Sequence, residues 1–274
     1  MNAASAFARR QAGPPVEPFD SIAPIYDCIF TDSAIGRVQR GQVTAEMNRR
    51  FKSGSRVLEL NCGTGEDAIQ MGRRGVEVKA YDASPAMIEV ANRKLLAVPP
   101  AANVSFGILR NEDLCLVEGS FDGALSNFAG MNCCGDWPAI AKELARLVMP
   151  GGHVLLCIMG RACLWEMLYF LLRREPGKAF RRASRDHVAR IGSNSVDLHY
   201  LSVKEAQQAF SPEFNLYGWG GVGVFVPPSY CEPFFKAHNQ LLRLLAVFDS
   251  WLGHVPGVRC FGDHVLLDFV RCAG

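Results

Sequence analysis

The sequence predicts an α/β domain in which a mainly parallel sheet carries helices on both faces. Short apolar runs alternate with segments whose apolar residues have helical spacing, and this alternation is typical of strand-helix-strand units. The apolar run 57–60 stops at two glycines, and helical spacing resumes at once after them. A second apolar run, 76–81, follows and ends in Asp82. These three observations predict a strand, a tight glycine turn, a helix and a second strand.

The later elements continue the same alternation. Ser84 and Asp136 are helix N-caps, each followed within two residues by a proline in the first turn. The expected strands are 56–60, 76–81, 104–108, 121–128, 153–159, 214–219 and 264–270. The expected helices are 42–51, the segments that begin after Gly65, Ser84 and Asp136, then 203–210 and 231 or 232 to 251.

Length and composition fit one large domain, or one domain with a cap. The chain has 274 residues, 49% of them hydrophobic, and a formal net charge of +2. The near-neutral charge gives no reason to expect nucleic-acid binding. Ten cysteines occur without a C-x-x-C pair or zinc-ligand spacing, so we expect reduced thiols, a cytoplasmic protein and no metal. The longest apolar stretch, 154–172, contains two charges and predicts a strand that runs into a helix rather than a membrane span.

The glycine turn has the chemistry of a cofactor site. Gly63 and Gly65 lack a Cβ, so a ligand can approach the backbone there, and the following helix offers free N–H donors. Asp82 falls at the carboxyl end of the next strand, where dinucleotide folds place the acid that binds a ribose. A nucleoside with a carboxylate or phosphate is the predicted ligand.

Three motifs resemble those of class I S-adenosylmethionine-dependent methyltransferases. Glu59 to Gly65 resembles the E-x-x-x-G-x-G turn of this family, and Asp82 to Met87 resembles its acid-x-S-x-x-M stretch. Met149 to His153 resembles its P-G-G turn before the fifth strand. Gly63, Gly65 and Ala68 also satisfy the G-x-G-x-x-G/A pattern of NAD enzymes, but such a site needs neither an acid inside the first strand nor the P-G-G turn.

The resemblance implies a Rossmann-like, seven-stranded mixed sheet with helices on both faces, to which this chain adds a helical cap after the fifth strand. It implies S-adenosylmethionine as the cofactor and S-adenosylhomocysteine as the product. Glu59 is expected to orient the glycine loop, or else to pair with backbone amides as a purely structural residue. The implied cofactor-binding residues are Tyr26, Arg40, Glu59, Asn61, Cys62, Gly63, Gly65, Asp82, Ala83, Met87, Glu112, Asp113 and Asn127.

The amino-terminal part divides into a leader and the core. Residues 1–18 are expected to be a flexible leader, since their prolines disfavour the amphipathic helix of a transit peptide. Residues 19–160 are the cofactor-binding core with its lid helices. The segment 19–27 resembles the F-D-x-x-A-x-x-Y-D segment that folds over the cofactor in small-molecule methyltransferases. The resemblance implies that Tyr26 and Arg40 reach the carboxylate of the cofactor. The alternative for Tyr26 is a residue packed within a helix, and the alternative for Arg40 is a solvated charge.

Two places depart from the family pattern. Arg110 occupies the position that usually holds an adenine-binding aspartate, so Glu112 or Asp113 takes that role, or backbone atoms alone do. The loop 130–134 lacks the motifs of DNA-methylating enzymes. It follows a strand end, where open α/β sheets bind ligands, so Phe128, Met131 and Asn132 are predicted to contact the substrate. Cys133 and Cys134 are expected to be small apolar fillers rather than reactive thiols.

Residues 161–200 form an insertion, the predicted substrate cap, and 201–274 complete the sheet with one lid helix. The helix 164–172 is rich in aromatics, and its Trp165 and Tyr169 are predicted substrate contacts. The stretch 173–190 is strongly basic. The interpretations are a core helix with a solvated loop, a cap over a hydrophobic pocket, or a patch for an acidic substrate or for transient contact with anionic lipid.

The predicted function is methyl transfer to an O or N atom, or to a C atom, of a hydrophobic small molecule such as a secondary metabolite, quinone or lipid. His199 is the predicted general base and Tyr200 the residue that positions the acceptor. The rival interpretations are an NAD(P)-dependent oxidoreductase and a non-catalytic protein that binds S-adenosylmethionine. We expect a monomer or a homodimer.

Overall fold

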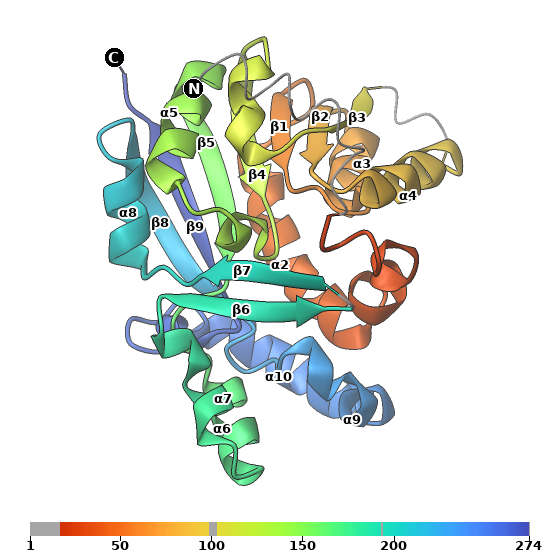
Figure 1. Cartoon of the computed structure of the whole chain (residues 1–274), viewed down its shortest axis with the longest axis vertical. Helices are drawn as coiled ribbons and strands as arrows, with labels where there is room; N and C mark the ends of the chain where they lie inside the picture. Colours follow the sequence, from red (N-terminus) through yellow and green to blue (C-terminus); the bar gives the residue numbers. More distant parts are fainter. Residues whose placement is uncertain (1–16, 99–102, 193, 274) are drawn as a thin grey trace.

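A seven-stranded mixed sheet forms the centre of the molecule (Figure 1). The computed structural model describes residues 17–98, 103–192 and 194–273. The spatial order is β3-β2-β1-β4-β5-β9-β8; neighbours among the first five are parallel, and β9 is antiparallel to both β5 and β8. The expected Rossmann-like sheet is confirmed. Its strands are β1 Arg56–Leu60, β2 Glu77–Asp82, β3 Val104–Ile108, β4 Phe121–Ser126, β5 Val148–Ile158, β8 Phe214–Val222 and β9 His264–Arg271.

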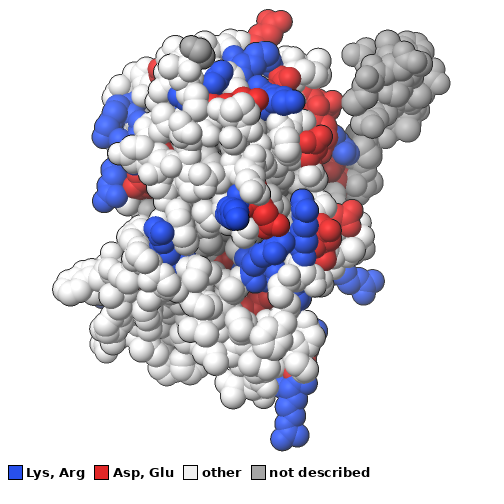
Figure 2. Space-filling model, turned by 90° about the vertical axis from the view of Figure 1, so that its left-hand side faces the viewer, with Lys and Arg blue, Asp and Glu red and all other residues white. Residues whose placement is uncertain are grey.

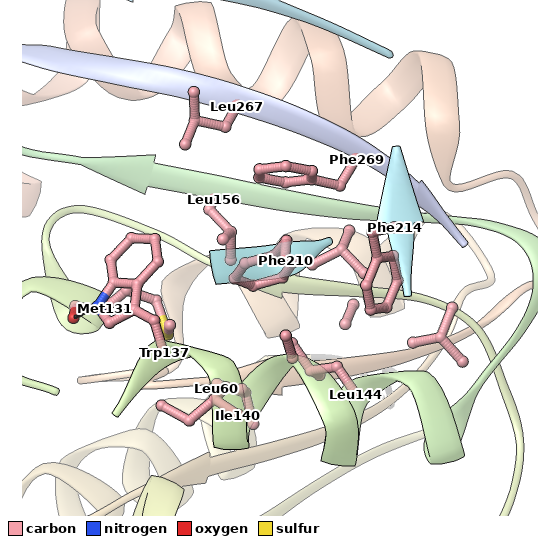
Figure 3. Close-up of a cluster of buried hydrophobic side chains, with 14 of the residues drawn as sticks. Leu60, Met131, Trp137, Ile140, Leu144, Leu156, Phe210, Phe214, Leu267 and Phe269 are labelled. Carbon is pink, nitrogen blue, oxygen red and sulfur yellow. Dashed lines mark hydrogen bonds between the residues drawn. The ribbon is translucent and has the colours of Figure 1, made fainter. Parts of the chain in front are cut away.

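Two helices, α5 (Trp137–Leu147) and α8 (Val203–Phe210), cover one face of the sheet. The Asp136 side chain accepts the N–H of Ala139 at 3.0 Å, and Ser202 and Glu205 form a capping box on α8. Figure 3 shows Trp137, Ile140 and Leu144 of α5 in one apolar core with Phe210 and with strand residues. Burial of this apolar surface fixes both helices on the sheet.

Three helices lie on the opposite face: α2 (Ala34–Arg50), α3 (Glu66–Arg73) and α4 (Pro85–Leu96). Helix α2 begins eight residues before the predicted start of 42. The Glu232 carboxylate accepts the N–H groups of Ala34 and Ile35 at 2.7 and 3.0 Å, which satisfies two free donors of the first turn. This cap comes from a residue remote in sequence, so local pattern could not reveal it.

The insertion after β5 is helical only in its first part. It begins with α6 (Leu164–Leu172), as the apolar run predicts, and continues with the short α7 (Pro176–Ala179), which was not predicted. It then forms an antiparallel hairpin of β6 (Asp186–Ile191) and β7 (Asn194–His199), which the prediction of a solvated loop missed. The hairpin lies across the carboxyl edge of the sheet, beside the amino-terminal turns (Figure 1).

The predicted lid helix is broken in two. Helix α9 (Glu232–Ala237) ends at His238, whose ψ of 48° is not helical, and α10 (Asn239–Leu252) follows. Within the described residues no helix is both long enough and apolar enough to cross a bilayer. The remaining turns are η1 Ala23–Ile25, η2 Asp27–Thr31, η3 Asn111–Leu116, η4 Gly130–Cys133, η5 Arg181–Ala183, η6 Ser229–Cys231 and η7 Arg259–Phe261.

A buried ionic cluster ties the insertion to the sheet. Glu166 on α6 accepts hydrogen bonds from Arg181 and Arg182, each at 2.8 Å. Arg182 also donates to Asp263, just before β9, at 2.8 Å. Burial alone would raise the pKa of the Asp263 carboxyl, but the nearby His264 and Arg182, and the hydrogen bonds from Arg182 and Gln39, together lower it. Two of the seven basic residues in the stretch 173–190, Arg181 and Arg182, therefore have a structural role.

Candidate active site

The turn between β1 and α3 opens toward a cavity. Asn61, Gly63 and Gly65 all have positive φ angles, of 55°, 53° and 76°. A Cβ on Gly65 would lie 2.5 Å from the Phe106 ring, so only glycine fits there, whereas a Cβ on Gly63 would meet nothing within 4 Å. Gly63 lines the cavity. The turn is therefore packed against Phe106 at Gly65 and open to the cavity at Gly63, so a ligand can approach its backbone there.

Asp82, at the end of β2, braces this turn. Its two carboxylate oxygens accept the backbone N–H of Gly63 at 2.8 Å and of Ser84 at 2.9 Å. Burial raises the pKa of Asp82, and the two N–H groups partly offset that rise. Asp82 lines the cavity beside the open glycine, so its oxygens can also accept hydrogen bonds from a ligand's hydroxyls.

The cavity has a volume of about 460 Å³. Ten of the thirteen residues predicted to bind the cofactor line it, and Gly65, Glu59 and Asp113 do not. Its polar side is formed by the glycine turn, the end of β2 and the amino-terminal segment. The predicted residues on its wall are Tyr26, Arg40, Asn61, Cys62, Gly63, Asp82, Ala83, Met87, Glu112 and Asn127.

One end of the cavity holds a charged cluster around Asp67, a residue that the sequence analysis missed. Asp67 accepts hydrogen bonds from Arg40 at 2.6 Å and from Asn127 at 2.9 Å through a single oxygen. Its other oxygen, and Nε of Arg40, are buried without a partner among the described residues. Unpaired buried polar atoms beside a cavity suit a zwitterionic ligand. The signal for Asp67 was its place in the first turn after the glycines.

The segment 19–27 lies over the glycine turn and is held there by two carboxylates. Ser84 donates its hydroxyl to Asp20 at 2.6 Å, and Thr64 donates its hydroxyl to Asp27 at 2.6 Å. Tyr26 lines the cavity, and burial raises its pKa to about 12. The ordered wall starts before residue 19, because Glu17 and Pro18 also line the cavity. The rest of the predicted leader, 1–16, lies outside the described residues.

Arg110, the departure from the family pattern, forms an ion pair with Glu17. Both residues line the cavity, together with Glu112, whereas Asp113 does not. Burial, together with nearby Asp20 and Asp82, raises the pKa of Glu17, and Arg110 lowers it in part. The amino-terminal segment thus brings the Glu17 carboxylate to the part of the wall where Arg110 replaces the aspartate that is usual in the family.

Glu59 lies behind the turn rather than in the cavity. It is buried in β1, and its Oε2 has no partner among the described residues. Burial, and next the Asp67 carboxylate, raise the pKa of Glu59 well above its usual range. The folded protein therefore holds this carboxyl protonated at pH values at which the unfolded chain ionises it.

Replacing Glu59 with glutamine is expected to raise the melting temperature, by a margin that grows with pH. A carboxyl whose pKa is raised by folding favours the folded state fully below its unfolded pKa of about 4.3, and this contribution is lost as the pH rises toward the folded pKa. Glutamine has the same shape and does not ionise. Thermal unfolding of both proteins across the pH series measures the margin. The exposed Glu118→Gln serves as the control, and a margin that shrinks with rising pH would contradict the expectation.

The loop after β4 divides between cavity and core. Asn127 and Phe128 line the cavity, as do Cys133 and Cys134. Met131 was predicted to contact the substrate, but it is fully buried in the apolar core of Figure 3. Asn132, the other predicted substrate contact in this loop, does not line the cavity either.

Asn132 ties the loop to the chain around it. Its amide donates to the carbonyls of Met159 and His199, at 3.1 and 2.8 Å, and accepts the N–H of Met159. These bonds occupy a side chain that was predicted to bind substrate. The Asn132 side chain is buried at little cost because both its amide nitrogen and its oxygen are hydrogen-bonded within the protein.

The hairpin forms an apolar roof that the sequence analysis did not foresee. Ala189 and Ile191 of β6 and Val196 and Leu198 of β7 line the cavity. Their alternation with charged and polar residues was the available signal, since side chains in a strand point to opposite faces in turn. The Asn194 amide donates to the carbonyl of Pro18 at 3.4 Å, which joins the hairpin to the amino-terminal segment.

Four further predicted residues do not reach this cavity. His199 pairs with Asp186 across the hairpin at 2.7 Å, and Tyr200 is buried beside the ionic cluster. Trp165 donates to the carbonyl of Phe225 at 2.8 Å. Trp165 and Tyr169 line a separate groove between α6, α9 and α10. The geometry therefore gives no support to a general base at His199 or to substrate contacts on α6.

The comparisons with known proteins agree with this architecture. Residues 57–152 match a family described as a methyltransferase domain. The demethylmenaquinone methyltransferase of Clavibacter sepedonicus is 27% identical over 201 residues, which cover 73% of this chain and 78% of the relative. The ubiquinone biosynthesis O-methyltransferase of Xanthomonas oryzae pv. oryzae is 32% identical over 129 residues, or 47% and 52% of the two chains.

A solved structure shows the same fold. The S-adenosylmethionine-dependent methyltransferase from Mesorhizobium loti superposes with a TM-score of 0.53 and 16% identity, over 87% of this chain and 98% of that one. This likeness shows the fold alone; the matched domain, with the glycine turn inside it, identifies residues 57–152 as a methyltransferase domain of the class I, S-adenosylmethionine-dependent type. The chain is an enzyme of the methyl-transferring class.

Proposed function

We propose that this methyltransferase acts on a hydrophobic ring compound of the quinone or hydroquinone kind. The observation that carries the proposal is the two-sided cavity, which has a charged wall on the sheet and an apolar roof on the hairpin. The names of several relatives, among them those from Clavibacter and Xanthomonas, refer to menaquinone and ubiquinone synthesis. A flat, apolar acceptor suits the roof better than a charged one does.

The charged wall suits the donor. In this proposal Arg40 and the free oxygen of Asp67 hold the carboxylate and ammonium of the methionine end, and the open face of Gly63 accommodates it. Asp82 accepts hydrogen bonds from the ribose hydroxyls. Glu17, held by Arg110, takes the place of the family's adenine acid. Glu112 lines the same wall and is the alternative partner of the adenine amino group.

The chain's own contribution to the chemistry is placement and the exclusion of water. When bound, S-adenosylmethionine supplies a methyl group already activated by its sulfonium. The Phe128 ring lines the cavity, and the Arg40 guanidinium carbon lies 4.8 Å from the centre of this ring. The roof and the segment 19–27 cover the cavity and so reduce the access of water.

Among the described residues that line the cavity, neither a histidine nor a thiolate is available as a general base. The lining contains no histidine in the described part of the chain. Burial raises the pKa of Cys133 to about 12 and of Cys134 to about 11, so both thiols stay protonated at neutral pH. An acceptor with an acidic hydroxyl, such as a hydroquinone, loses its proton more easily than an alcohol does. This chemistry supports a phenolic acceptor, with the methyl group going to its oxygen or to an adjacent ring carbon.

Incubation with labelled S-adenosylmethionine and a panel of demethylated quinols tests the proposal. We expect label in the organic phase with at least one quinol, and none with hydrophilic amines or nucleic acid. Calorimetric titration with S-adenosylmethionine and with NAD separates the oxidoreductase alternative, because the cofactor that binds identifies the class. Donor binding without labelled product from the panel or from a native extract would support a non-catalytic protein.

A charge on the inner face of the hairpin is expected to impair the acceptor and spare the donor. Val196 lines the cavity, whereas Val188 on the paired strand is 61% exposed on the outer face. Val196→Asp should raise the KM for the acceptor at least about tenfold, since a carboxylate there must be desolvated against an apolar ligand. Val188→Asp is the matched control. Steady-state kinetics and donor titrations measure both effects, and equal KM changes in the two variants would argue against an acceptor site under the roof.

A further inference from the structure

Helix α10 is apolar on two opposite faces. Its inner face packs through Leu242, Leu245 and Ala246 on a cluster that includes Ile35 of α2. Its outer face is apolar as well and carries six exposed large hydrophobic side chains. These are Leu241, Leu244, Val247, Phe248, Trp251 and Leu252. An apolar helix face is ordinarily covered, and here protein covers only the inner of the two apolar faces.

Helix α6 repeats this arrangement. Glu166 points into the buried ionic cluster, while Leu164, Leu168 and Leu171, at helical spacing, are exposed. Leu172 at its end is 86% exposed. Both helices expose one apolar stripe that the fold itself does not use.

An aromatic groove joins the two stripes. Trp165 lies against Phe235 with ring centroids 6.2 Å apart, and Tyr169 lies against Tyr230 at 4.9 Å. Phe234, exposed on α9, also lines this groove. We call the groove and the outer faces of α6, α9 and α10 the exposed apolar surface.

This surface gathers most of the molecule's exposed apolar side chains. More than half of the exposed large hydrophobics among the described residues lie in residues 164–180 and 230–261. Figure 2 shows the lower part of the molecule as largely uncharged, with Lys and Arg atoms at its lowest tip. Soluble monomers rarely expose so large a continuous apolar area without a binding partner.

The charges around the surface are positive. Of the nearby carboxylates, Glu166 is paired with two arginines, Glu232 caps α2, Asp249 accepts three backbone N–H groups and Glu175 pairs with Lys178. The exposed cationic side chains on these helices and their ends that have no carboxylate partner among the described residues are Arg173, Arg174, Lys236 and Arg243. A symmetric contact between two copies through this face would place positive charge against positive charge.

We propose that the exposed apolar surface binds the surface of an anionic lipid bilayer. The leucines and aromatic rings enter the boundary between headgroups and acyl chains, and the arginines and lysines lie against lipid phosphates. The basic stretch 173–190 takes part only through its exposed members, because Arg181 and Arg182 are engaged by Glu166 and Asp263. The proposal goes beyond the methyl transfer, and its test requires no acceptor.

Sedimentation with vesicles of phosphatidylcholine, with and without phosphatidylglycerol, tests the binding. We expect the full chain to bind the vesicles that contain phosphatidylglycerol, and to bind less at high salt, since screening weakens the charge attraction. Trp251 is 78% exposed on the surface, so its fluorescence should shift to shorter wavelength on binding, and the shift should vanish in Trp251→Phe. Equal binding to neutral vesicles, or none at low salt, would overturn the proposal.

Two matched pairs of variants locate the contact. Leu172→Glu on α6 is compared with Leu96→Glu on α4, because the two leucines are 86% and 87% exposed. Arg243→Glu on α10 is compared with Arg93→Glu on α4, because both arginines are exposed. Leu172→Glu and Arg243→Glu should each lower the affinity for the vesicles at least about fivefold, which is the contribution of one cationic side chain at a charged membrane. Leu96→Glu and Arg93→Glu should bind the vesicles as the unaltered protein does.

S-adenosylmethionine titration of each variant shows that it is folded, and equal losses within a pair would refute the assigned surface. Sedimentation velocity without vesicles provides the remaining outcome. A dimer that Leu172→Glu dissociates, in a protein that binds no vesicles, would assign the surface to a second copy of the chain and overturn the lipid proposal. Vesicle binding in a protein that methylates no quinol would leave this inference standing and remove the proposed acceptor.

Discussion

Replacing Asp82 with alanine is expected to weaken the binding of S-adenosylmethionine at least about 30-fold. The carboxylate lines the cavity and also accepts the N–H groups of Gly63 and Ser84, so the variant loses the proposed ribose contact and a brace of the turn. Leaving such donors without an ionised partner costs about 2 kcal/mol or more, and about 1.4 kcal/mol corresponds to tenfold in affinity. Isothermal titration of the purified variant measures the loss.

Asp113→Ala is the matched control for this measurement. Asp113 was predicted to contact the adenine, but it does not line the cavity. Its removal should leave the dissociation constant within about twofold, a change well below 1.4 kcal/mol. Thermal unfolding of both variants separates loss of binding from loss of fold. Unchanged affinity in Asp82→Ala would remove this carboxylate from the site.

Glu166→Ala is expected to lower the free energy of unfolding by about 3–5 kcal/mol. The substitution leaves Arg182 buried with only Asp263 to compensate it, and removing one partner of a buried ion pair costs that much. It also cuts the link between α6 and the start of β9. Urea unfolding at constant pH, read from the midpoint and slope, gives the difference.

Glu175→Ala in the same insertion is the comparison. Glu175 pairs with Lys178 near the surface, where an ion pair contributes about 1 kcal/mol at most. A loss in Glu166→Ala no larger than in Glu175→Ala would show that the buried cluster does not hold the insertion on the sheet.

The parts of the site that lie in continuous motifs could be predicted from the sequence. Gly63, Asp82 and Met87 lie in short segments whose spacing alone determines the turn, the strand end and the helix cap. The seven strands of the central sheet followed from the alternation of apolar runs and helices. Such features depend on contacts between near neighbours in the chain, and these are the contacts that local patterns record.

The parts that depend on distant contacts could not be predicted. Glu17 reaches the cavity only because the amino-terminal segment folds back onto Arg110, far along the chain. Trp165 was predicted to contact substrate because α6 is apolar, but a helix with apolar residues on all sides does not reveal which side faces the cavity. The hairpin was missed for a related reason: only four apolar residues mark its inner face, and the apolar Val188 on its outer face interrupts their alternation with polar residues.

The cavity takes its charged wall from residues 17–134 and its apolar ceiling from the strands 186–199 inside a single insertion. If donor and acceptor lie as proposed, the two recognition tasks are encoded in separate stretches of the gene. Grafting the hairpin of a relative onto this scaffold would then exchange the choice of acceptor while leaving the donor's binding site untouched. Related enzymes could diverge in substrate by this route without rebuilding the machinery that they share.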